Sequence, residues 1–229
     1  MVAVYEDGKK AGGKRSLSDA SAASRDPREL VWISLVEPSR EELDSVARQF
    51  ALQELAQEDS ETRKGVILKS QGRGLTFMVS PARYLDDSGT VEIGELDILL
   101  EEGLAITVLR GEGPNFHDVE QGLEEGSYLS RLGSGAILRA LLHRVLDDYV
   151  SVVDGLGDDL ASLEDDVLGG DGRVTNSLYE LSREVANFQR VTQHLEAVLE
   201  GLAHRGSQEP GSNSQLGMRL GVARSRARG

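Results

Sequence analysis

The sequence predicts an α/β protein in which a mixed-sheet α/β/α domain is followed by a long helical hairpin leading into a stalk helix. Two observations support this fold class. Between residues 30 and 134, short runs rich in β-branched residues alternate with helical patterns too irregularly for a regular doubly wound sheet. Between residues 135 and 204, apolar residues recur at steps of three and four over two long stretches, which is typical of amphipathic helices.

Length and composition place the chain among globular proteins and exclude several classes of site. It has 229 residues, 39% of them hydrophobic and 4% aromatic, so we expect an aliphatic core. The net charge of −14 opposes nonspecific binding to nucleic acid and suits a cationic partner such as a metal ion. The absence of cysteine excludes disulfides, thiolate zinc sites and cysteine nucleophiles. No apolar run approaches the roughly 20 residues of a spanning helix, and no signal peptide is present, so we expect a soluble cytoplasmic chain.

The first 29 residues are expected to form a disordered leader. They contain few large apolar side chains and include a run of small and polar residues from Ser16 to Ser24. Such a composition offers little apolar surface to offset the entropy lost on ordering the chain.

The α/β part, residues 30–134, opens with a buried strand at residues 31–36. Ser39 stands three residues before Glu42, which is the spacing of a capping box. The helix that it begins carries an apolar stripe ending at Phe50, and a second short helical piece is expected at residues 54–59.

Four further strands are expected before the chain becomes helical. Residues 65–69 and 75–79 flank a glycine-containing turn and predict a β-hairpin. Residues 91–100 and 104–108 read as two more strands, and from Asp118 onward the pattern is helical.

The helical hairpin consists of residues 136–168 and 174–203, joined by a glycine-rich turn. Gly155 and Gly157 suggest a bend in the first helix. Residues 205–229 are basic and rich in glycine and serine, and we expect a disordered tail, with contact to nucleic acid or a membrane surface as the alternative.

Sequence signatures of catalysis are missing, so we do not expect an enzyme. The chain contains no Gly-x-Ser-x-Gly nucleophile elbow, no Walker loop and no complete dinucleotide-binding loop. None of the four histidines lies three or four residues from another, which excludes a helical metal-binding pair. His143 lies on or near the apolar stripe of its helix and is expected to be structural.

Acidic residues are concentrated in the helical hairpin. They are Asp147, Asp148, Asp154, Asp158, Asp159, Glu164, Asp165, Asp166 and Asp171. Carboxylates are natural ligands of hard cations, and a bound cation would relieve their repulsion. A solvated helix face that keeps the protein soluble explains the same pattern, and the sequence leaves both interpretations open.

Several segments between Val31 and Ala203 together form a recognisable pattern. They are Trp32–Pro38 with Glu41–Leu43, Phe50–Leu52 through Leu55–Asp59, Arg83–Tyr84, Glu95–Ile98, Ile106–Val108, Leu141–Tyr149, Leu163–Leu168 and Leu178–Glu184. No single segment is specific, but the order and spacing of the segments together are. In this order and spacing the chain resembles the cytoplasmic domain of the CorA family of magnesium and cobalt transporters.

The resemblance implies that five such chains form a funnel and that magnesium bound between neighbouring subunits holds the channel closed. It implies that Glu58 and Asp59 are metal ligands of this sensor, with Mg2+, or Co2+ as the alternative, as regulatory ligand or transported ion. No catalytic cofactor is implied. A second acidic position of some members falls on His143, a poor magnesium ligand, and the family's Arg-Pro-Lys is replaced here by Arg63-Lys64-Gly65.

Beyond Ala203 the chain departs from the family, which continues through the stalk into two membrane helices with a Gly-Met-Asn loop. Here Gly217-Met218 is followed by Arg219, and no apolar span precedes it. We therefore expect a module without its own pore, from a truncated or frameshifted gene or from a free-standing relative. Its expected partners are further copies, a pentamer in the family, or an intact transporter subunit at the cytoplasmic face of the plasma membrane. The alternative is a free-standing soluble regulatory or interaction protein that binds a partner through its helix hairpin.

Overall fold

The computed structural model describes residues 1–13, 15–52, 68–69, 74–125, 133–169 and 174–208. Its main element is a seven-stranded sheet in the order β2-β1-β3-β9-β8-β5-β4. The strands are β1 (Val2–Glu6), β2 (Lys9–Lys10), β3 (Glu29–Val36), β4 (Leu68–Lys69), β5 (Leu75–Val79), β8 (Glu95–Glu101) and β9 (Leu104–Arg110). Strands β3 and β9 are parallel and the other neighbours are antiparallel, which confirms the predicted mixed sheet.

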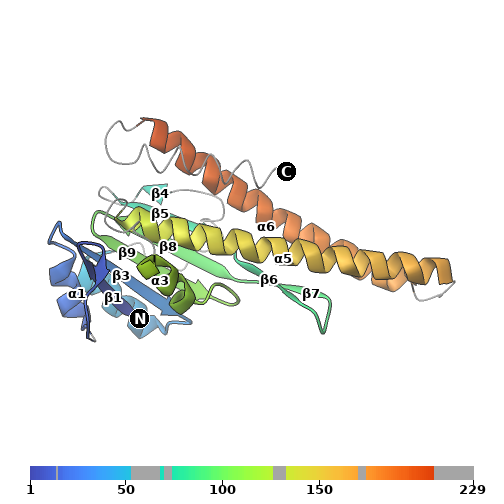
Figure 1. The fold of residues 1–229 in the computed structure, drawn as a ribbon, viewed down its shortest axis with the longest axis horizontal. Helices are drawn as coiled ribbons and strands as arrows, with labels where there is room; N and C mark the ends of the chain where they lie inside the picture. The colour runs from blue at the N-terminus through green and yellow to red at the C-terminus, as the bar shows by residue number, and fades with distance from the viewer. Residues whose placement is uncertain (14, 53–67, 70–73, 126–132, 170–173, 209–229) are drawn as a thin grey trace.

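Helices cover both faces of this sheet (Figure 1). On one face, α1 (Leu17–Ala23) and α2 (Arg40–Phe50) pack on a cluster that includes Ile33 of β3. On the other face, α3 (Phe116–Glu125), α5 (Ser134–Gly169) and α6 (Val174–Gln208) enclose a larger cluster that includes Trp32. The alternation of strand side chains separates these two neighbours, and the predicted α/β/α layering is confirmed.

The expectation of a disordered leader at residues 1–29 is wrong. Strand β1 pairs with β3 from Val2 opposite Ile33 to Glu6 opposite Glu29, and it buries Ala3, Val4 and Tyr5 almost completely. Composition alone missed the short β-branched run at the start of the chain, because its stability comes from pairing with a distant strand.

The run of small and polar residues from Ser16 to Ser24 forms α1 and its two caps. Ser16 caps this helix through a reciprocal capping box with Asp19, and Ala20 is fully buried. The small residues that suggested disorder allow α1 to pack closely beside β1 and α2.

The predicted start of α2 is confirmed. Ser39 Oγ accepts a hydrogen bond from the backbone N–H of Glu42, while the Glu42 carboxylate accepts one from the backbone N–H of Ser39. The helix ends at Phe50, followed by Ala51 in the left-handed region. The helical piece expected at residues 54–59 lies outside the described residues.

The β4–β5 hairpin is confirmed where it is described, with Leu68 opposite Thr76. The strand expected at residues 91–100 is instead divided into β7 (Thr90–Ile93) and β8. The division falls at Gly94, where an added Cβ would lie 1.7 Å from the Glu112 carbonyl oxygen. The chain therefore needs glycine at this crossing, and β7 leaves the main sheet.

Strand β7 pairs with β6 (Ala82–Leu85), which the sequence did not reveal, in a separate two-stranded ribbon. Only the first residue of β6 is buried, so the strand lacks the alternation of buried and exposed residues on which strand prediction depends. In Figure 1 this ribbon projects below the middle of α5.

The helical hairpin is longer than predicted. Helix α5 is continuous from Ser134 to Gly169, without a break at Gly155 or Gly157, and α6 extends to Gln208. Figure 1 shows α5 running over the sheet and well past it, with α6 returning beside it. Tyr149 and Phe188 join the two helices in an edge-to-face contact with ring centroids 5.1 Å apart. Residues 209–229 of the expected tail lie outside the described residues.

Candidate functional site

The expected metal ligands Glu58 and Asp59 lie outside the described residues, as does Arg63-Lys64-Gly65. Their role therefore stays a prediction. Among the residues that the structure describes, no group of three or more His, Asp or Glu side chains is arranged to hold a metal ion.

The structure divides the acidic residues of the hairpin into two sets. Asp148 pairs with Arg144 at 3.1 Å, and burial raises the pKa of the Asp148 carboxyl despite that partner. Asp159 accepts a hydrogen bond from Tyr84. The remaining described members are exposed to solvent; they are Asp147, Asp154, Asp158, Glu164, Asp165 and Asp166.

His143 lies on the exposed side of α5 and lines a groove between α3 and α5. The groove encloses about 270 Å³, with Val119 and Leu123 on its walls and Asp118 and Asp147 among its polar residues. The histidine was expected to be structural, packed or partly exposed, on or near the apolar stripe; it is exposed, and its structural role stays a prediction.

A second cavity lies at the carboxyl ends of the parallel strands β3 and β9, where ligands bind in many open α/β sheets. It encloses about 620 Å³ and is lined by Val36, Leu109, the loop 111–115 and the start of α3. Ser34, also in its lining, is 2% exposed, and its hydroxyl has no hydrogen-bond partner within the described part of the chain.

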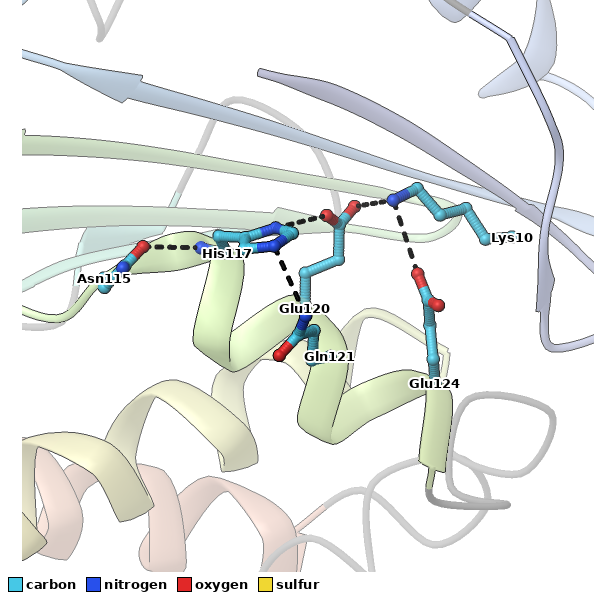
Figure 2. Close-up of polar contacts among 6 residues, drawn as sticks. All are labelled: Lys10, Asn115, His117, Glu120, Gln121 and Glu124. Carbon is cyan, nitrogen blue, oxygen red and sulfur yellow. Dashed lines mark hydrogen bonds and ion pairs between the residues drawn. The ribbon is translucent and has the colours of Figure 1, made fainter.

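A polar cluster on α3 centres on the buried carboxylate of Glu120 (Figure 2), which is 2% exposed. Lys10 of β2 approaches it, with Nζ 3.0 Å from Glu120 Oε1 and 3.3 Å from Glu124 Oε1. His117 Nδ1 lies 3.8 Å from Glu120 Oε2, and its Nε2 lies 3.3 Å from Gln121 Nε2. The carboxylates raise the pKa of Lys10, mainly through the hydrogen bond to Glu120. The ion pair links the β1–β2 hairpin at the N-terminus to α3.

The same carboxylates act on Tyr5, which lies in β1. Burial raises the pKa of the Tyr5 hydroxyl strongly, and the negative charges of Glu120 and Glu124 add to the effect. Sequence analysis missed this cluster because it assigned Lys10 to a disordered leader. A lysine within a short β-branched hairpin was the signal that could have found it.

The β6–β7 ribbon is held on the helical hairpin at two points. Tyr84 donates a hydrogen bond to Asp159 Oδ2 on α5 at 2.6 Å, and the backbone N–H of Val91 donates to Glu184 Oε2 on α6 at 3.1 Å. Glu184 is 6% exposed. These contacts connect the β6–β7 ribbon to the hairpin, along which the acidic residues lie.

Comparison with known proteins gives a consistent family and fold. A family model described as "CorA-like Mg2+ transporter protein" matches residues 27–219. No curated protein matches the chain. No helix of the described residues is both long and apolar enough to cross a membrane.

Three solved structures share the fold. The soluble domain of CorA from Methanocaldococcus jannaschii is 15% identical with a TM-score of 0.62, covering 99% of this chain and 93% of that one. The full-length CmaX protein is 16% identical with a TM-score of 0.70, covering 99% of this chain and 71% of that one. The ZntB cytoplasmic domain from Vibrio parahaemolyticus RIMD 2210633 is 10% identical with a TM-score of 0.64, covering 99% and 90%. At these identities the similarity is one of fold.

Proposed function

Since the chain belongs to the CorA-like Mg2+ transporter protein family, we propose that it is a metal-sensing cytoplasmic domain of a divalent cation transporter. The observation that carries the proposal is the family match over residues 27–219, which includes the sheet from β3 onward and the helical hairpin. The family is one of transporters, and we propose no enzymatic reaction for this chain.

The proposed ligand is Mg2+, with Co2+ as the alternative, and the proposed ligands on the protein are Glu58 and Asp59. A net charge of −14 makes the association of copies electrostatically costly. A divalent cation shared by carboxylates of neighbouring subunits relieves this repulsion, so metal binding and assembly favour each other. The proposed assembly is a ring of copies, a pentamer as in the family, or a complex with an intact transporter subunit.

The proposed location is the cytoplasm, at the inner face of the plasma membrane when the domain is part of a transporter. In this proposal, membrane helices of the transporter subunits conduct the ion. The domain described here binds the metal and thereby controls whether the channel is open or closed.

Calorimetric titration of the full chain with Mg2+ tests the metal site directly. We expect saturable binding that is lost in the Glu58→Gln/Asp59→Asn double variant, because amide oxygens carry no charge to offset dehydration of the cation. Asp165→Asn is the control. Asp165 is exposed on the hairpin, and the substitution removes a carboxylate charge of the same kind away from the proposed site. Equal binding by the double variant and the chain itself would refute the site assignment.

A second candidate function is partner binding through the hairpin. Helix α5 extends past the sheet (Figure 1). From Val150 onward it exposes several large apolar side chains, among them Val153 and Val167. Where exposed apolar side chains form a contiguous patch, they mark interaction sites.

A further inference from the structure

We propose that the far half of α5 is a docking surface for a cationic amphipathic helix of a partner protein. The proposal names the partner of the second candidate function and rests on it.

The first supporting observation is a second apolar seam on α5. One seam, with Val152, Leu156 and Leu163, is buried in the hairpin. A separate row of positions 150, 153, 157, 160, 164 and 167, called here the α5 seam, follows steps of three and four; four of the six are valine or leucine, and the others are Gly157 and the exposed Glu164. Its apolar members are well exposed: Val150 59%, Val153 56%, Leu160 47% and Val167 56%.

The spacing of the α5 seam is that of a helix-docking surface. Alternating steps of three and four form the a/d pattern with which one helix packs against another. At its centre lies Gly157, and an added Cβ there would meet no atom within 4 Å. The seam is therefore open to solvent at Gly157, where no side chain of its own stands in the way of a partner.

The second observation is charge. No lysine, arginine or histidine occurs between Arg144 and Arg173, while the α5 segment between them carries eight aspartates and glutamates. Four exposed aspartates, Asp147, Asp154, Asp158 and Asp165, follow the outer flank of the α5 seam. A partner helix with lysine or arginine beside its own apolar row would complement both features.

Other occupants fit less well. A second copy of this hairpin would bring two acidic rows together, which like-charge repulsion opposes. A single bound cation does not explain exposed valine and leucine. A single cation also cannot contact all four aspartates of the flank, since residues seven apart on a helix are separated by about 10 Å.

Two synthetic helical peptides test the proposal on the full chain in metal-free buffer. Both have leucine at the apolar heptad positions, and they differ only in having lysine or glutamate at the flanking positions. We expect the lysine peptide alone to bind by fluorescence anisotropy, with an affinity that falls as salt rises. The double variant Val153→Ser/Leu160→Ser should bind the lysine peptide about tenfold more weakly or worse. The double variant Asp154→Asn/Asp158→Asn should also bind it more weakly, and its affinity should depend less on salt.

Matched controls lie away from the seam. Val36→Ser removes a valine that is 58% exposed at the end of β3, and Glu102→Gln removes an exposed carboxylate in the turn before β9; neither should alter peptide binding. Far-ultraviolet circular dichroism verifies that each variant is folded.

Three results would overturn the proposal. They are equal binding of both peptides, no binding of either, and binding that is insensitive to the seam variants. Self-association of the chain without peptide, abolished by Leu160→Ser, would show that a second copy occupies the seam. The peptide assay contains no metal, so its outcome is independent of the separate Mg2+ titration: absence of peptide binding together with a normal Mg2+ titration would reject this proposal and leave metal sensing intact.

Discussion

The hydroxyl of Tyr84 donates a hydrogen bond to Asp159 Oδ2 at 2.6 Å, and the Tyr84 ring lies against the backbone of α5 at Gly155. A Cβ added to Gly155 would stand 2.3 Å from Tyr84 Cδ1. With the bond from Val91 to Glu184, this contact fixes the β6–β7 ribbon to both helices of the hairpin. The ribbon is therefore joined to the hairpin by two hydrogen bonds, one to each helix.

The first prediction concerns this contact. Alanine normally stabilises an exposed helix position relative to glycine by about 1 kcal/mol. Gly155→Ala should instead lower the free energy of unfolding by about 1–3 kcal/mol, because the new methyl group must displace the Tyr84 ring. Urea denaturation followed by circular dichroism measures the change.

Gly157→Ala, two residues away on the same helix, is the matched control. Nothing lies within 4 Å of a Cβ added there, so the free energy of unfolding of this variant should rise by up to about 1 kcal/mol. Equal effects of the two substitutions would show that the Tyr84 contact is not tight.

Local signals predicted much of the fold. The capping box of Ser39 and Glu42, the β4–β5 hairpin and the long apolar periodicity of α5 and α6 depend on residues close in sequence. Strand β1 was missed because its pairing partner, β3, is distant in sequence, and β6 was missed because its residues do not alternate between buried and exposed. The Glu120 cluster was missed with them, since Lys10 and Glu120 are brought together only by the tertiary fold.

The second prediction tests the ion pair of Lys10 and Glu120. Lys10→Met leaves the carboxylate of Glu120 buried without its cation, so we expect a loss of about 1–3 kcal/mol in unfolding free energy. The double variant Lys10→Met/Glu120→Gln should recover part of this loss, because the buried charge is also removed. Lys9→Met, at the exposed neighbouring position, is the control and should have little effect.

A double variant as unstable as Lys10→Met alone would argue that Lys10 acts through packing of its aliphatic chain. A double-mutant cycle in urea separates the two contributions.

The third prediction concerns stability at alkaline pH. Burial, with the hydrogen bond to Asp159 and the nearby carboxylates, raises the pKa of Tyr84 to about 12. The folded state therefore holds this proton more tightly than the unfolded state, whose tyrosine pKa is about 10. The resulting stabilisation is complete below about pH 10 and is lost as the pH rises toward about 12.

Tyr84→Phe should make the fall in unfolding free energy between about pH 9 and about pH 11.5 shallower than in the parent chain. Burial also raises the pKa of Tyr149, so a residual slope is expected in this variant. An identical slope with and without the Tyr84 hydroxyl would contradict the assigned coupling to Asp159.

The fourth prediction concerns Ser34. Its hydroxyl is buried without a hydrogen-bond partner among the described residues, so it contributes a desolvation cost to the fold. Ser34→Ala should leave the unfolding free energy unchanged or raise it by up to about 1 kcal/mol, measured by urea denaturation. Thr107→Ala is the contrasting control, because the Thr107 hydroxyl accepts a hydrogen bond from the indole of Trp32 at 3.1 Å. If Ser34→Ala lowers the free energy of unfolding as much as Thr107→Ala does, the Ser34 hydroxyl has a hydrogen-bond partner in solution.

Sedimentation velocity of the full chain, in metal-free buffer and in millimolar Mg2+, tests the central claim most directly. The account predicts that Mg2+ converts a slowly sedimenting species into a larger ring-sized assembly. It also predicts that Glu58→Gln/Asp59→Asn abolishes this shift while Asp165→Asn preserves it. An unchanged sedimentation coefficient across all Mg2+ concentrations would contradict metal sensing through assembly.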